Sequence, residues 1–176
     1  MVTVYADHDG FRGDAVFSLY PSTTEKELKE KVDEAVRNAL LIKNTPYALP
    51  EKDSCEETLP SNLDELPMPQ MAARIAELVF GAAEDTGGQL NAVEVFLYKH
   101  RDSVLNSRGL QKTQHSYSAM VEAIPTYNGS RESVELYEQY NFSALDESAL
   151  KEEIRGKMLA VKERYEAEKP DFPMDC

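Results

Sequence analysis

Residues 91–125 read NAVEVFLYKHRDSVLNSRGLQKTQHSYSAMVEAIP, and this stretch decides the fold of the chain. Two apolar segments, 93–99 and 113–124, are joined through the sequence Asn106-Ser107-Arg108-Gly109. Asparagine and glycine both tolerate the positive φ angles that a tight turn between strands needs. The stretch therefore predicts strands on either side of a turn at 106–109.

The surrounding sequence predicts further strands. Segment 93–99 is apolar at almost every position, which is typical of a strand covered on both faces. A short strand is expected at 103–106, and a one-sided alternation predicts another at 133–142. Near the amino terminus, 2–6 and 15–20 flank a polar, glycine-containing connection at 7–14, which predicts a hairpin.

Three segments show the apolar spacing of amphipathic helices. The first begins after Thr23 or Thr24, either of which can cap it, and should end near residue 43. The second is expected at about 70–85, and the third is capped by Asp146. Residues 44–69 hold five prolines among acidic residues, which predicts a connector that contains neither helix nor strand.

These elements predict an α+β fold in one domain over 1–176, with about three helices packed on a mixed, largely antiparallel sheet. The helix sequences at 24–40 and 146–162 can be aligned, and a predicted hairpin precedes each. This similarity favours a duplicated hairpin-helix unit. The alternative is that two acidic amphipathic helices match through composition alone.

The composition limits the partners of the protein. Nineteen basic and 32 acidic residues give a formal net charge of −13, which repels a phosphate backbone and an anionic membrane surface. We therefore expect neither nucleic acid nor a membrane as a partner. Residues 1–5 lead directly into a strand pattern, without the basic start and apolar run of a secretory signal, which predicts a cytoplasmic protein.

The sequence does not predict a metal site. A zinc peptidase helix needs two histidines one turn apart with a glutamate between them. The three histidines, His8, His100 and His115, are far apart in the sequence, and we assign no catalytic residue and no metal ligand. A hydrolase whose site assembles only in space stays open as an alternative.

The strands around the asparagine-serine-x-glycine turn resemble the amino-terminal domain of the TldD/PmbA family of zinc metallopeptidases. Segment 121–125, the last helix and the first hairpin are also similar, so the resemblance covers most of the chain. It implies an amino-terminal α/β domain that contributes to a homo- or heterodimer of related subunits and encloses unfolded peptide substrates. The family's H-E-x-x-x-H motif is absent here. Zinc is accordingly expected in a separate carboxy-terminal domain, and this chain is expected to be inactive alone.

Within this resemblance, Asn106, Arg108 and Gly109 are the candidate substrate-binding residues. Arg108 can hold a peptide carboxylate through two parallel hydrogen bonds, or it can form an ordinary surface ion pair. The alternative for the turn as a whole is a purely structural connection. The alternative for the protein is a self-contained acidic module that binds a partner protein through its helix faces or through residues 44–69.

Overall fold

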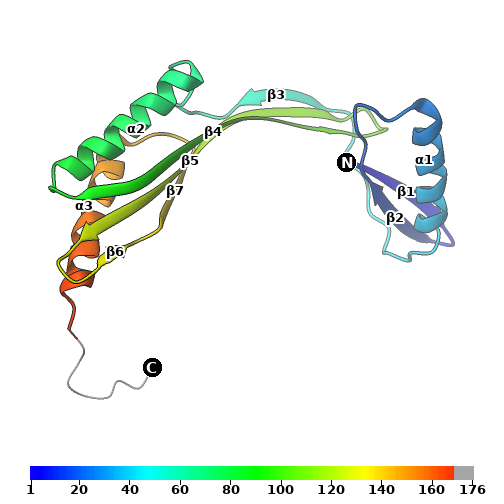
Figure 1. Ribbon diagram of the computed structural model, residues 1–176. Helices are drawn as coiled ribbons and strands as arrows, with labels where there is room; N and C mark the ends of the chain where they lie inside the picture. Colours follow the sequence, from blue (N-terminus) through cyan, green and yellow to red (C-terminus); the bar gives the residue numbers. More distant parts are fainter. Residues whose placement is uncertain (169–176) are drawn as a thin grey trace. The chain divides into compact units, whose positions relative to one another are not determined.

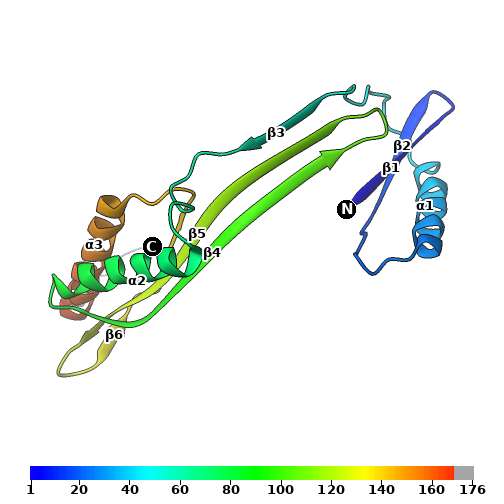
Figure 2. The ribbon, with the colours of Figure 1, turned by 90° about the horizontal axis from the view of Figure 1, so that it is seen from above.

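The computed structural model describes residues 1–168, and the chain divides into two compact units, Met1–Glu51 and Lys52–Cys176. The sequence predicts one domain over 1–176, whereas the contacts of the chain gather into two groups. The boundary between the groups falls within the predicted connector at 44–69. The two units are drawn in Figures 1 and 2 and are described separately below.

The first unit begins with a hairpin of two strands, β1 (Val2–His8) and β2 (Phe11–Phe17). Their antiparallel register runs from Val2↔Phe17 to His8↔Phe11. The turn is only Asp9 and Gly10, at φ 48° and 77°. Positive φ at both central residues matches the twist of the flanking strands, so a two-residue turn is enough. The predicted connection at 7–14 is therefore wrong, because most of it is strand.

Helix α1 (Glu25–Ala39) packs on this hairpin. Thr24 caps it in a capping box with Glu27, which confirms one of the two predicted caps. The helix comes so close to β2 that a Cβ on Gly13 would lie 1.7 Å from the carbonyl oxygen of Ala39. Glycine is the residue that allows this approach. The helix ends four residues before the predicted 43, because the N–H groups of Leu41 and Ile42 already form turn hydrogen bonds.

The second unit is built on two long antiparallel strands, β4 (Gln89–Leu105) and β5 (Gln111–Asn128). β3 (Ser54–Thr58) runs parallel to β5 on the side away from β4. β6 (Ser133–Glu135) and β7 (Glu138–Phe142) pair antiparallel with β5 (Figure 1).

Three strand predictions need correction. The separate strands expected at 93–99 and 103–106 are one continuous β4, and the strand expected at 133–142 is interrupted between β6 and β7. The predicted connector contributes β3, because the segment without proline at 54–58 is free to pair with an exposed edge of β5. Proline restricts a ladder only where its missing N–H is needed.

Helices α2 (Met68–Glu84) and α3 (Glu147–Glu166) pack on one face of this sheet. Asp146 caps α3 by accepting hydrogen bonds from the N–H groups of Ser148 and Ala149, as predicted. The core lies between the helices and the sheet, and its most deeply buried large side chains include Ile75, Val79, Val121 and Ile154. The α+β class, with three helices and a mixed, largely antiparallel arrangement, is confirmed.

The prediction that segment 93–99 is covered on both faces is wrong. Among the described residues β4 pairs only with β5, which makes it an edge strand. Val93, Val95 and Leu97 pack against the core, whereas Phe96 and Tyr98 do not belong to it. The apolar residues on the second face therefore do not fill the core of this unit.

Each of α1 and α3 follows an antiparallel hairpin, β1–β2 in one unit and β5 with β6 and β7 in the other. The common origin of the two hairpin-helix units stays a prediction. Within residues 1–168, no helix combines the length and the apolar character needed to cross a membrane.

Candidate functional site

The turn between β4 and β5 is closed by the side chain of Asn106. Its Oδ1 accepts hydrogen bonds from the backbone N–H groups of Arg108, at 2.9 Å, and Leu110, at 3.0 Å. Its own N–H donates to the carbonyl oxygen of Leu110, and its carbonyl accepts from Gly109. This is the use of asparagine expected in a turn, where a short amide mimics the backbone.

Gly109 takes a positive φ of 92°, which disfavours any other residue at this position. The side chain of Lys52 lies against it, 3.3 Å from the place of a Cβ. Arg108 is exposed at the tip of the turn. Asn106 and Gly109 thus have structural roles that explain their presence, and a contact of Asn106, Arg108 or Gly109 with substrate stays a prediction.

The three histidines have separate partners. The Nε2 atom of His8 lies 3.1 Å from the carbonyl oxygen of Ile42 in the first unit. His100 bonds the Ser118 hydroxyl at 2.9 Å, and His115 bonds the Glu56 carboxylate at 2.8 Å. The bond from His115 lowers the pKa of Glu56. His100 and His115 project from opposite faces of the ribbon, because His100 is directly paired with Ser116, the neighbour of His115.

The described residues do not bring a metal-binding set together. Between residues 1 and 168, no three histidine, cysteine, aspartate or glutamate side chains gather where they could hold a metal ion. Cys55 is exposed on β3, and Cys176 lies outside the described residues.

The end of the β4–β5 pair next to the turn at 106–109 is held by polar contacts from β3 and from the residue before it. Asp53 forms an ion pair with Lys112, Glu57 accepts a hydrogen bond from Gln114, and Glu56 pairs with His115. The ion pair lowers the pKa of Asp53 and raises the pKa of Lys112. β3 thus joins β5 through charged and amide side chains.

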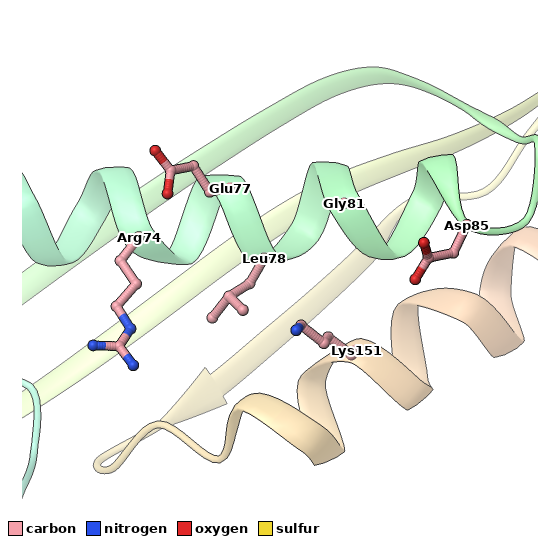
Figure 3. Close-up of a pocket in the computed structure, with 6 residues that line it drawn as sticks. All are labelled: Arg74, Glu77, Leu78, Gly81, Asp85 and Lys151. Atoms are coloured by element: carbon pink, nitrogen blue, oxygen red, sulfur yellow. The ribbon is translucent and has the colours of Figure 1, made fainter.

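A cavity of about 410 Å³ lies between α2 and α3 (Figure 3). Arg74 and Leu78 of α2 and Lys151 of α3 point into the space between the helices, whereas Glu77 points away from α3. Ion pairs join the two helices, Arg74 with Glu147 and Arg155 with Asp85. These ion pairs use Arg74 and Asp85, two of the four charged residues that line the cavity.

The second face of the main sheet is the face opposite α2 and α3, and no sequence motif indicates it. Its side chains come from alternate positions of the two long strands, beginning with Glu94, Phe96, Tyr98 and His100 on β4 and including Ser118, Met120, Glu122 and Ile124 on β5. Neither α2 nor α3 covers these positions, since both helices pack on the residues between them. The sequence contains a partial signal, because Glu94, the one acidic residue of 93–99, stands between Val93 and Val95. Pairing in register was needed to see that residues from both strands form one surface.

The comparison with solved structures finds a related fold. The chain is similar to TldE from Thermococcus kodakarensis, with a TM-score of 0.53 and 20% sequence identity. The match covers 88% of this chain and 36% of TldE. Neither a family model nor a curated protein matches the sequence. The chain therefore has a TldD/TldE-like fold over most of its length and spans about a third of the length of TldE.

Proposed function

We propose that the chain acts as the non-catalytic amino-terminal domain of a TldD/TldE-like protein. In this role it contributes dimer contacts and helps to enclose unfolded peptide substrates. The observation that carries the proposal is the likeness to TldE over 88% of the chain. Zinc in a separate carboxy-terminal domain and a cytoplasmic location are parts of the same proposal.

The edge of the sheet supports the binding of extended peptides. β4 is 17 residues long and pairs on one side only within the described residues. An unpaired strand edge offers N–H and C=O groups that an added strand can bond. Main-chain bonds of this kind do not depend on side chains, so they suit a protein that receives unfolded chains of varied sequence.

The surface of the first unit supports dimer contacts. Its buried apolar side chains are limited to Ala35 and Ala39, while Tyr20 is 64% exposed and Leu41 is 79% exposed. Apolar surface of this kind marks interaction sites when it is continuous. We expect Leu41→Glu to shift the protein toward monomer in sedimentation analysis, whereas Leu159→Glu on α3 of the second unit, at a side chain 56% exposed, should leave its oligomeric state unchanged.

The test of the peptide role is binding without cleavage. The fluorescence anisotropy of labelled unstructured peptides should rise when the protein is added. The peptides should stay intact, with or without zinc. A peptide N-methylated at alternate residues cannot donate the bonds of an added strand and should bind at least tenfold more weakly. Hydrolysis that zinc restores and a chelator blocks would overturn the non-catalytic role.

A second candidate is an acidic interaction module that binds a folded partner. The cavity between α2 and α3 favours it, because Lys151 points into an open space flanked by ion pairs. Under this function Lys151→Ala weakens partner binding, and N-methylation of a peptide has no consequence. The N-methylated peptide separates the two candidates, because only the peptide-binding role predicts that it binds more weakly.

A further inference from the structure

The free edge of β4 has a chemically distinct row of side chains beside it. On the face that the helices leave uncovered, the row along the strand is Glu94, Phe96, Tyr98, His100, Asp102 and Val104. A strand added to this edge places its own alternate side chains next to these residues. The row therefore influences which side chains an added peptide can carry on this face.

The row contains a negative charge without a compensating cation. Glu94 stands directly opposite Glu122 across the β4–β5 ladder. Like charges in directly opposed positions destabilise a sheet. Within residues 1–168 neither carboxylate forms an ion pair with a lysine or arginine, and the hydroxyl of Tyr137 bonds Glu122. A cation next to Glu94 would relieve this repulsion.

The next two positions of the row are aromatic. Phe96 faces Met120 across the ladder, and Tyr98, which is 42% exposed, faces Ser118 and stacks on His100 with ring centroids 5.8 Å apart. Both aromatic rings lie outside the core of the unit. Aromatic side chains bind apolar groups well on a sheet surface, where cross-strand neighbours are close.

We propose that this edge selects extended peptides in which a lysine or arginine stands two residues from an apolar residue. The cationic side chain lies next to Glu94, and the apolar side chain lies next to Phe96. The spacing is two because side chains on one face of a strand recur at every second residue. The inference rests on the proposed function, in which a peptide adds to the edge of β4.

Charge distinguishes this occupant from a second copy of the chain. A second copy paired through the same edge would bring two acidic rows together, in a protein of net charge −13. The cost of placing like charges together disfavours that arrangement. A cationic and apolar peptide complements both features of the row.

The first experiment compares three peptides of equal length, of which the first two have the same composition. One carries lysine and leucine two residues apart, a second carries them three residues apart, and a third replaces lysine by glutamate at the first spacing. We expect the first to bind about threefold to tenfold more tightly than the second, and the third to bind most weakly. Equal affinity of the first two peptides would overturn the selection by spacing.

The second experiment changes the protein. The double variant Glu94→Gln and Glu122→Gln keeps the shape of both side chains and removes both charges. Its preference for the lysine peptide over the glutamate peptide should fall to less than half that of the parent, whereas Glu152→Gln on the outside of α3 should keep the preference. An unchanged preference in the double variant would contradict the role of Glu94. Urea unfolding should give a midpoint no lower than that of the parent, since a repulsion has been removed.

The outcomes separate this inference from the function on which it rests. If none of the peptides binds, or if N-methylated peptides bind as well as the others, the peptide-binding function itself is wrong. If unmodified peptides bind through their backbone but show no preference for charge or spacing, only the selection by the Glu94 row is wrong. The comparison of peptides on the unaltered protein gives this answer even if a variant fails to fold.

Discussion

In both units a helix packs on an antiparallel hairpin, but the side chains between helix and sheet differ in size. In the second unit, α2 and α3 bury Ile75, Val79 and Ile154 against β4 and β5. In the first unit, the buried apolar side chains are Ala35 and Ala39, and the helix lies against the backbone of β2 at Gly13. The second unit therefore depends on apolar volume, and the first on a close backbone approach.

The largest expected effect is the loss of volume from the second unit. Ile154 is fully buried, and Ile154→Ala should lower the free energy of unfolding by about 2–5 kcal/mol, because it removes apolar contacts and leaves a cavity. Urea unfolding followed by circular dichroism measures this. Leu159→Ala on the same helix, at a side chain 56% exposed, should change stability by less than about 0.5 kcal/mol. Similar losses for the two variants would contradict the role assigned to the core.

The next effect tests the close approach in the first unit. In Gly13→Ala the added methyl would lie 1.7 Å from the Ala39 carbonyl oxygen, so α1 must move away from β2. We expect a cost of about 1–3 kcal/mol, seen as faster hydrogen exchange in α1 with unchanged exchange in α2.

The matched control for this variant is Gly81→Ala. A Cβ at Gly81 meets no atom within 4 Å, and alanine favours a helix, so stability should rise by about 0.5–1 kcal/mol. If Gly13→Ala left hydrogen exchange in α1 unchanged, the close contact between Gly13 and Ala39 would not be what stabilises the first unit.

The helix caps allow the same kind of change, the loss of a capping side chain, to be compared in the two units. Thr24→Ala and Asp146→Ala each remove a side-chain acceptor from a helix amino terminus, and each should cost about 1 kcal/mol. Hydrogen exchange should locate the first loss in α1 and the second in α3. Serine at either position should retain most of the stability, because its hydroxyl can also cap. A loss that appears in both helices for either variant would mean that the two units unfold together.

The smallest effect concerns a single tyrosine of the second unit. Hydrogen bonds from Ser130 and Arg131 stabilise the phenolate of Tyr165 and lower its pKa to about 8, whereas burial raises the pKa of Tyr140. As pH rises, Tyr165 should therefore lose its proton before a tyrosine of ordinary pKa near 10 does, and Tyr140 after it. The ultraviolet absorbance of tyrosinate follows this titration. Tyr165→Phe should remove the early step, and an early step that persists in this variant would assign it to another residue.

Local patterns predict the three helices, the main turn and the fold class, but not every strand. The cap at Asp146, the apolar stripes of the helices and the turn at Asn106 are short-range features that the sequence predicts correctly, and Thr24 is one of the two caps predicted for the first helix. The strand β3 was missed because its pairing partner is β5, more than fifty residues away along the chain. The proline-rich composition predicts a connector around β3 but does not indicate which strand β3 pairs with.

The candidate site was predictable only in part. The turn residues Asn106 and Gly109 were identified, but their observed contacts are within the turn, and substrate contact there stays a prediction. The opposition of Glu94 and Glu122 depends on the register of β4 with β5. A register is set by the whole ladder and the turn together, so no single segment contains it.

The sequence by itself determined where helices begin, where the main hairpin turns and that the chain carries a large negative charge, because these properties depend on residues close together in the chain. Only the tertiary structure decided that β4 is an edge strand within residues 1–168, that α2 and α3 pack on one face of its sheet and that two glutamates meet on the other face. The physical reason is that an edge and a face exist only once distant segments have paired and the helices have packed on one side. The same apolar residues in 93–99 suit a fully covered strand or an edge strand with one exposed row, and the packing of the helices selects between them.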